Sequence, residues 1–354
     1  MEGLWYYFCA VFMAFSSKYE DYASIRNEME EVSHRLISWY ESHKRALPWR
    51  ETSDPYAIWV SEIILQQTRV AQGYDYYVRF MHAFPSVGAL AEADEDQVLR
   101  LWQGLGYYSR ARNMHAAAKQ IVAQGSFPET YDAILNLKGV GPYTAAAIAS
   151  FAFGLPHAVV DGNVCRLMAR LFAVEEPIDT SKGKSQVESL AKALMPEGQS
   201  ALFNQAVMEF GALQCVPTSP RCEECPLADK CLALSQGRVE ALPRKSHRTK
   251  VTERYFHYFL IEDGESLYLR KRTDDDIWRS LYELPLKEVA TPDADEETLP
   301  VKSVRHVLSH QVIHASLYRQ TVVPPLPPRE GCLVVRWNDL DDYALPRLVQ
   351  ILLE

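Results

Sequence analysis

The sequence lacks an apolar run long enough to cross a membrane. The apolar stretch near its N-terminus covers 13 residues, from Gly3 to Phe15, whereas a transmembrane helix needs about 20. No Lys or Arg precedes it, although a secretory signal normally starts with basic residues. We interpret residues 1–25 as a disordered leader or the result of a misassigned start codon, with a signal peptide as the disfavoured alternative.

Positive charge is also scarce. The formal net charge is −9, which would ordinarily count against a nucleic-acid partner. Binding follows local patches, however, and not totals. Between Arg238 and Arg254, six Lys and Arg residues against two Glu give a local charge of +4. The overall charge therefore does not exclude DNA.

Repeats of solenoid length are absent, and 354 residues are enough for two domains with separate cores. Helical periodicity predicts helices at residues 32–40, 58–70, 98–102, 145–153 and 164–172. Aromatic and β-prone residues predict strands at 255–261, 266–270, 314–323 and 331–337, before a closing helix at 345–353. We expect an all-helical domain at 26–234, a basic linker at 235–252 and a smaller mixed α/β domain at 253–354.

Cysteines are few and unevenly placed. Four of the seven lie within 17 residues, in a C-x6-C-x2-C-x5-C pattern: Cys215, Cys222, Cys225 and Cys231. In an intracellular chain, such local clustering favours a metal over two disulfides. Zinc and a [4Fe–4S] cluster both accept four thiolates, but zinc sites usually contain two C-x2-C pairs and this segment has one. We favour the cluster, stabilising a loop at 215–231 that is too short for its own core, with zinc and disulfides as alternatives.

The segment Leu137-Lys-Gly-Val-Gly-Pro142 lies between two helical stretches. Glycine costs a helix roughly 1 kcal/mol and proline about 3 kcal/mol, so this composition marks a tight turn. Backbone N–H groups at the start of a helix attract anions, and glycine lets the backbone approach a ligand closely. Gly139, Val140 and Gly141 are therefore candidates for binding a DNA phosphate, with a plain turn between packed helices as the alternative.

Two carboxylates are notable for their surroundings. Glu62 has apolar neighbours in sequence, and desolvation there would raise its pKa into the range of a general acid near neutral pH. A Glu on the solvated face of a helix is the alternative. Asp161 precedes a helical segment and suits an N-cap, where backbone N–H groups would hold it ionised. A neutral and an ionised carboxylate are the pairing that cleaves bonds between a sugar and a heteroatom.

Several motifs together resemble the helix-hairpin-helix DNA glycosylases and, more closely, the MutY family of adenine DNA glycosylases. They are LPWR, WVSEIILQQT, GLGYYSR, LKGVGPYTAAAI, VDGNV, NQAVMEFGALQC and the four-cysteine run. The resemblance covers residues from about 30 to about 350. It implies a mainly α N-terminal helix-hairpin-helix glycosylase domain with a four-Cys iron–sulfur loop, followed by a C-terminal α/β Nudix-like domain.

The family flips adenine out of the duplex and removes it. By resemblance, Glu62 protonates the adenine and later activates water, Asp161 stabilises the oxocarbenium-like sugar, and Asn163 supports it electrostatically. Tyr143 stands where related lyases have a lysine that forms a Schiff base, and a phenol cannot form that imine. Lys138 lies before the matching position. The resemblance therefore implies a monofunctional glycosylase.

The resemblance also implies residues that hold the DNA and the flipped base, for each of which ordinary packing or surface exposure is the alternative. These are Arg50, Leu65 and Val70 lining the base pocket, Glu209 near the adenine, Gln67 inserted into the duplex, and Tyr107 as a wedge beside the oxidised guanine.

The C-terminal part resembles the family's Nudix-like module, which recognises 8-oxoguanine. It contains no R-E-x-x-E-E run, so nucleotide hydrolysis is not expected. Residues 308–310 match the family's Phe-Ser-His hairpin, with Leu308 in place of Phe. By resemblance, Ser309 accepts the N7 hydrogen that distinguishes the oxidised base, with His310 beside it. A plain hairpin start is the alternative.

These features predict a base excision repair enzyme that hydrolyses the N-glycosidic bond of adenine mispaired with 8-oxoguanine or guanine. We expect a monomer with a [4Fe–4S] cluster, acting on double-stranded DNA in the cytoplasm at the nucleoid, and no membrane association. Two alternatives are an endonuclease III-like glycosylase/lyase for damaged pyrimidines and a non-catalytic DNA-binding protein.

Overall fold

The computed structural model describes residues 22–246, 251–291 and 299–354. Contacts divide them into two units, each assembled from segments that are distant in sequence. The helical unit comprises the described residues up to Ile63 and from Ser126 to Ser246, and the mixed unit comprises Ile64–Gly125 and the described residues from Val251 onward. None of the helices formed by these described residues is long and apolar enough to cross a membrane.

The helical unit is built from amphipathic helices and short 3-10 turns. The α-helices are α2 (Tyr22–His43), most of α3 (Pro55–Leu65), α8 (Tyr131–Leu135), α9 (Pro142–Phe153), α10 (Gly162–Leu171), α11 (Ser181–Leu194), α12 (Ser200–Leu213) and α13 (Leu232–Ser235). The 3-10 turns are η1 (Pro48–Arg50), η2 (Cys222–Glu224), η3 (Ala228–Lys230) and η4 (Val239–Ala241).

The main core of this unit lies where α2, α10, α11 and α12 meet. Leu36, Met168, Val187 and Phe203, one from each helix, are fully buried there. Burying such a side chain stabilises the fold by roughly 1.5–3 kcal/mol. This packing fixes α10, whose N-terminal end carries Asp161.

The predicted helix-hairpin-helix is present as α8, a turn and α9. Gly139 has a φ of 76°, in the left-handed region that favours glycine, and Val140 is buried beneath the turn. Gly141 occupies the N-cap of α9 and Pro142 its first turn. The turn therefore delivers Tyr143 at the beginning of a well-packed helix.

The mixed unit contains four helices from its first segment and a sheet from its second. The helices are α4 (Val70–Ala83), α5 (Val87–Glu92), α6 (Glu95–Leu101) and α7 (Ser109–Gln124). The strands are β1 (Thr252–Glu262), β2 (Ser266–Lys271), β3 (Tyr282–Glu283), β4 (Leu286–Val289), β5 (Lys302–Val307), β6 (Gln311–Thr321) and β7 (Leu333–Arg336). The 3-10 turn η5 (Trp337–Asp342) and α14 (Arg347–Leu353) follow.

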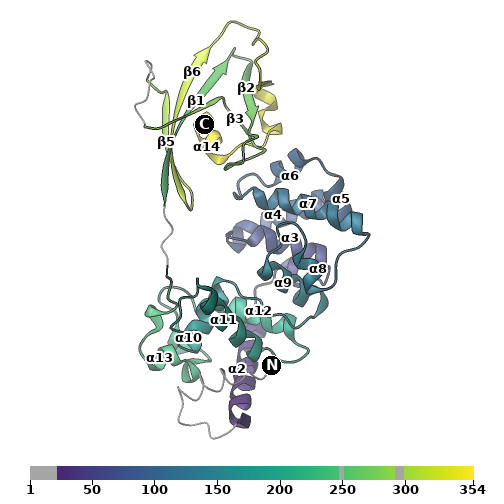
Figure 1. Cartoon of the computed structure of the whole chain (residues 1–354), viewed down its shortest axis with the longest axis vertical. Helices are drawn as coiled ribbons and strands as arrows, with labels where there is room; N and C mark the ends of the chain where they lie inside the picture. Colours follow the sequence, from purple (N-terminus) through teal and green to yellow (C-terminus); the bar gives the residue numbers. More distant parts are fainter. Residues whose placement is uncertain (1–21, 247–250, 292–298) are drawn as a thin grey trace. The chain divides into compact units, whose positions relative to one another are not determined.

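The sheet has the order β3-β2-β1-β6-β5 (Figure 1). Strand β4 pairs with β1, and β7 pairs with β2. Its central pair, β1 and β6, is parallel and in register from Thr252↔Gln311 to Glu262↔Thr321. Strands β5 and β6 form an antiparallel hairpin. Fully buried Leu348 and Val349 of α14 belong to the same core as Phe256 and Tyr258 of β1.

The predicted helix-hairpin-helix part and the α/β part that follows it are confirmed, with local differences from the sequence analysis. The helix expected at 58–70 is interrupted at residues 66–69, so that α3 ends and α4 begins there. The strands β3, β4 and β5 were not predicted, because they are short or lack a run of β-prone residues. Helix α2 already begins at Tyr22, inside the expected leader, whose residues 1–21 lie outside the described part.

The first part of the expected linker packs onto the helical unit. Leu242 is buried in a small cluster with Ala173 and Ala233. Arg238 and Arg244 both pair with Glu175. Two of the basic residues that gave this segment its local positive charge thus share one carboxylate within the fold.

Candidate active site

Glu62 lies in the third turn of α3 and is almost completely buried, with 7 % of its surface exposed. Most residues of α3 are apolar, so this helix has no solvated face at Glu62. Burial raises the pKa of the Glu62 carboxyl to about 7; the Asp161 carboxylate acts in the same sense, while the Tyr143 hydrogen bond and the Arg50 charge oppose the rise. Glu62 can therefore hold a proton near neutral pH.

Tyr143 contacts Glu62 directly. Its phenol donates a 2.8 Å hydrogen bond to Oε2 of the carboxylate. Burial and the two nearby carboxylates, Glu62 and Asp161, raise the pKa of Tyr143 well above its ordinary value, so the phenol remains a donor. The residue that follows the hairpin turn is thereby bonded to one acid and within electrostatic reach of the other.

Asp161 caps α10, as its residue type predicted. Its Oδ1 accepts a 2.7 Å hydrogen bond from the backbone N–H of Val164, and its Oδ2 accepts one of 2.7 Å from Nδ2 of Asn163. Burial nevertheless raises the pKa of Asp161, against the effect of these donors. The expectation that capping alone would hold this carboxyl ionised was thus incomplete, because the cap lies in a desolvated position.

Arg166 joins this end of α10 to the cysteine-rich segment. Its guanidinium donates to Oδ1 of Asn163 at 2.9 Å, to the carbonyl of Gly211 at 2.6 Å and to the carbonyl of Cys215 at 2.7 Å. A Cβ atom at Gly211 would come within 2.8 Å of Asn163, so only glycine fits there. Sequence reasoning missed both residues, although Arg166 follows the VDGNV motif by two positions and Gly211 lies inside NQAVMEFGALQC.

Glu209 is buried and forms ion pairs with two arginine side chains. Its carboxylate accepts from the side chains of Arg45 and Arg50 at 2.5–3.0 Å and from the backbone N–H of Arg45 at 3.0 Å. These donors outweigh its burial and lower the pKa of Glu209 to about 2. Glu209 thus holds Arg50, whose charge reaches Glu62. Arg45 was not predicted, since a single Arg in a turn carries no distinguishing pattern.

The helix-hairpin-helix turn presents accessible backbone. Gly139 is exposed, and a Cβ atom at Gly141 would meet no other atom within 4 Å. Free space in front of the N-terminus of α9 is what an anion contact requires. The side chain of Val140, by contrast, is buried and serves the packing of the turn.

The four clustered cysteines line one common pocket, with walls formed by α10, α12 and α13. Buried Arg170 closes it, donating to the carbonyls of Val216 at 2.7 Å and Pro217 at 2.9 Å and lying 3.5 Å from Sγ of Cys215. Among the described residues, no three Cys, His, Asp or Glu side chains are grouped as around a single metal ion.

In the mixed unit, Gln67 and Tyr107 share an unusual conformation. Both are exposed and have positive φ values, 56° and 47°, which costs a non-glycine residue of order 1–3 kcal/mol. Arg110 stabilises both turns by donating to the carbonyls of Gln66 at 2.7 Å and Gly106 at 3.1 Å. The strain is therefore maintained by a specific contact, as is typical of functional loops.

Leu65 and Val70 flank the same turn, as the last residue of α3 and the first of α4, and both are partly buried. A Cβ atom at Gly73 would lie 2.7 Å from Leu65, so glycine permits this close approach.

Ser309 and His310 form the tip of the β5–β6 hairpin and are exposed. The hydroxyl of Ser309 hydrogen-bonds to the phenol of Tyr107 within the mixed unit. Two residues more than 200 positions apart, both expected near the oxidised guanine, are thus in contact. Leu308 is partly buried and packs against the core of the sheet, so it fills the place expected for an aromatic residue with a smaller side chain.

Family models match both parts of the chain. Residues 60–197 match the HhH-GPD superfamily of base excision DNA repair proteins, and residues 257–354 match the NUDIX domain. The adenine DNA glycosylase of Buchnera aphidicola subsp. Acyrthosiphon pisum is 30 % identical over 337 residues, covering 91 % of this chain and 96 % of that protein. The adenine DNA glycosylase of Rattus norvegicus is 44 % identical over 222 residues, 59 % of this chain and 43 % of that protein.

Solved structures agree on the helical fold. A thermostable thymine-DNA glycosylase shares 28 % identity with a TM-score of 0.55, covering 59 % of this chain and 98 % of that chain. Endonuclease III in a non-covalent DNA complex shares 21 % identity with a TM-score of 0.52, covering 60 % and 97 %. The near full-length match to an adenine DNA glycosylase, together with the two family models, shows that this chain belongs to the MutY family of adenine DNA glycosylases.

Proposed function

We propose that this chain hydrolyses the N-glycosidic bond of adenine mispaired with 8-oxoguanine or guanine, acting as a monomer on double-stranded DNA. One observation carries the proposal: the buried carboxyl of Glu62, with a pKa of about 7, is bonded to Tyr143 and coupled electrostatically to Asp161. That combination provides a proton donor and a second carboxylate for one sugar.

The chemistry follows from the protonation states. Protonated Glu62 donates to the adenine ring, which turns the base into a better leaving group. Asp161 stabilises the positive charge that develops on the sugar as the bond breaks, and its contacts with Asn163 and Val164 keep it oriented. Ionised after the first step, Glu62 then acts as general base toward water.

Tyr143 favours base removal without strand cleavage. A lyase needs an amine that forms an imine with the sugar, and the group bonded to Glu62 is a phenol. The endonuclease III-like alternative therefore lacks its nucleophile at this position. By resemblance, Arg50 lines the base pocket and Glu209 lies near the adenine. Gln67, Tyr107 and the backbone of 139–141 contact the DNA, and Ser309 with His310 contacts the opposite base.

The pocket lined by Cys215, Cys222, Cys225 and Cys231 would hold a [4Fe–4S] cluster. Four thiolates, apolar walls and an adjacent buried arginine suit a cluster that carries negative charge. When bound, the cluster would link four positions within residues 215–231 to one another and so stabilise this loop, which packs against α10. Iron and sulfide analysis of the purified protein, with an absorption spectrum, tests the assignment; stoichiometric zinc without iron would refute it.

A base-release assay tests the enzymatic proposal. Duplexes with A opposite 8-oxoguanine, A opposite guanine and A opposite thymine are compared under single-turnover conditions, and release from the first two alone is expected. Borohydride trapping on the same duplexes should give no covalent adduct, while Tyr143→Lys provides an amine as positive control. No release from any duplex, or efficient trapping with Tyr143 in place, would overturn the proposal.

A further inference from the structure

The β5–β6 hairpin needs a precise position to read a base. Its turn is closed by a 2.8 Å hydrogen bond from Leu308 N–H to the carbonyl of Gln311, next to the register pair Val307↔Val312. Ser309 and His310 lie between these anchors and are exposed. Contacts at the base of the hairpin therefore decide where its tip lies.

The neighbouring strand β1 holds the hairpin's main chain. The backbone N–H of Thr252 donates to the carbonyl of His310 at 3.1 Å, and the Thr252 hydroxyl donates to the same oxygen at 3.3 Å. Thr252 pairs with Gln311, and Arg254, two residues along, points to the same face of the sheet. Arg254 is thus the next side chain able to reach Gln311.

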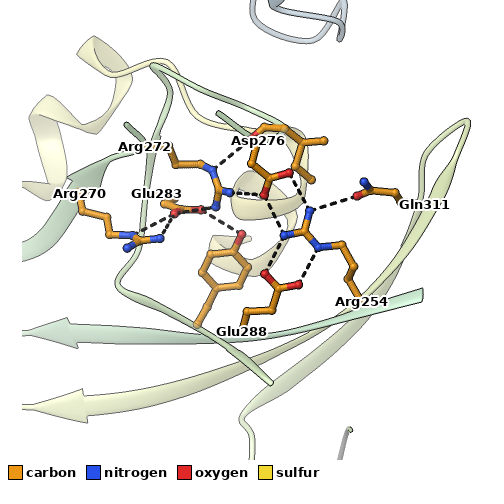
Figure 2. Close-up of polar contacts among 9 residues, drawn as sticks. Arg254, Arg270, Arg272, Asp276, Glu283, Glu288 and Gln311 are labelled. Carbon is orange, nitrogen blue, oxygen red and sulfur yellow. Dashed lines mark hydrogen bonds and ion pairs between the residues drawn. The ribbon is translucent and has the colours of Figure 1, made fainter. Parts of the chain in front are cut away.

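Arg254 uses its whole guanidinium to connect three segments (Figure 2). It binds Glu288 of β4 through two bonds of 2.7 Å, Asp276 through bonds of 2.9 and 2.8 Å, and Oε1 of Gln311 at 3.3 Å. Its planar group also lies over the ring of Phe256, with 4.8 Å to the centroid. Five hydrogen bonds from one guanidinium group restrict an arginine side chain far more than a single salt bridge on the surface does.

The Asp276 contact extends to the other strand of the hairpin. Asp276 belongs to the loop between β2 and β3, which also carries Trp278. The indole of Trp278 packs edge-on against His306 of β5, with 6.0 Å between ring centroids. Arg254 thus reaches β6 through Gln311 and the loop beside β5 through Asp276.

This loop has a rigid anchor of its own. Arg272 donates to Oδ2 of Asp276 at 2.9 Å and to both oxygens of Glu283, which is fully buried (Figure 2). Arg270 donates to the same Glu283 at 2.7 Å. The loop that Arg254 contacts through Asp276 is therefore anchored to buried Glu283 by Arg272.

We propose that Arg254 is a positioning residue for opposite-base recognition, setting the location of Ser309 and His310 through Gln311 and Asp276. The inference rests on the proposed role of this hairpin. Lysine retains the charge but offers a single nitrogen, so it cannot bond Glu288, Asp276 and Gln311 together in one plane. Arg254→Lys should therefore loosen the hairpin, and Gln311→Leu should do so without disturbing the two ion pairs.

The test measures binding in a Glu62→Gln background, so that it does not depend on catalysis. The dissociation constants for duplexes with A opposite 8-oxoguanine and A opposite guanine are compared for the parent, Arg254→Lys, Gln311→Leu and the double variant. We expect the preference for 8-oxoguanine to fall by about fivefold in each, the effect of roughly one hydrogen bond. The double variant should lose no more than the worse single one, because both changes break the same link.

Arg319→Lys is the matched control. Arg319 lies in the same strand as Gln311 and pairs with buried Glu262 at the far end of the β1–β6 register. The Arg319→Lys variant should keep the full preference for the duplex with 8-oxoguanine. The inference is wrong if folded Gln311→Leu keeps the full preference for 8-oxoguanine, or if it binds both duplexes more weakly by the same factor. Either outcome decides the question even if Arg254→Lys fails to fold. If the wild-type protein releases no adenine, while the Glu62→Gln parent prefers 8-oxoguanine and both variants lose this preference, the proposed catalysis fails and the role of Arg254 stands.

Discussion

The phenol of Tyr143 donates a 2.8 Å hydrogen bond to the carboxylate of Glu62, across 81 positions of sequence. The contact brings the helix-hairpin-helix turn, which delivers Tyr143, to the buried face of α3, which delivers Glu62. Burial favours the neutral carboxyl and raises the pKa of Glu62 to about 7, and this bond limits the rise because it favours the ionised carboxylate.

Glu62→Gln should abolish adenine release while leaving duplex binding nearly unchanged. Glutamine preserves the shape but cannot transfer a proton, and such a donor contributes about 10²- to 10⁴-fold in rate. Single-turnover release and equilibrium binding measure the two effects. Exposed Glu129→Gln in the same unit serves as control, and turnover of the Glu62 variant within tenfold of the wild type would contradict the assignment.

Tyr143→Phe should move the pH dependence of base release upward. The lost hydrogen bond stabilised the ionised form, so the pKa of Glu62 should rise above about 7 and the protonated acid should persist to higher pH. The alkaline limb of the single-turnover pH profile reports this pKa. Tyr131→Phe, in the same small core cluster, should leave the limb in place, and an unmoved limb in the Tyr143 variant would argue against the coupling.

Glu209→Gln should destabilise the helical unit. The carboxyl has a pKa of about 2 in the folded protein against an ordinary 4.5, so its ionisation stabilises the fold above about pH 4.5 by roughly 3 kcal/mol. This contribution decreases as the pH falls toward 2, because the carboxyl of the unfolded chain takes up its proton first. Urea unfolding at about pH 7 and at about pH 3.5 should show a difference between variant and wild type that narrows on acidification.

Ser309→Ala should weaken discrimination between 8-oxoguanine and guanine by about 1–2 kcal/mol, as expected for one neutral hydrogen bond. The ratio of adenine-release rates on the two duplexes measures it. Ser303→Ala, on β5 of the same hairpin, is the control, since its hydroxyl faces Ser316. If the ratio of release rates is the same for Ser309→Ala and the wild type, the Ser309 hydroxyl does not take part in recognising the opposite base.

Arg110→Lys should weaken duplex binding by about tenfold, since lysine cannot bridge the carbonyls of both strained turns. The turns would relax, and Gln67 and Tyr107 would lose the conformations that expose them. Titration of a labelled mispaired duplex measures the loss. Exposed Arg79→Lys of α4 changes the same residue type elsewhere in the mixed unit, and equal affinities for the two variants would dismiss a special role for Arg110.

The sequence alone determined the helical and mixed α/β parts, the hairpin turn and the residue types of the site. These depend on local features: periodicity, the φ that only glycine adopts easily at Gly139, and the cap preference of Asp161. The same local reasoning predicted one helix in place of α3 and α4. It missed the turn between them because Arg110, which stabilises this turn, lies more than 40 positions away.

Only the tertiary structure decided how the acids behave. In the folded chain, Glu62 is buried and bonded to Tyr143, and Glu209 has two arginine partners. At Asp161, burial raises the pKa, whereas the capping hydrogen bonds lower it. The tertiary structure also revealed that Arg166 and Arg254 each tie together segments that are distant along the chain. Desolvation and charge pairing depend on distances between residues far apart in sequence, and no local pattern encodes those distances.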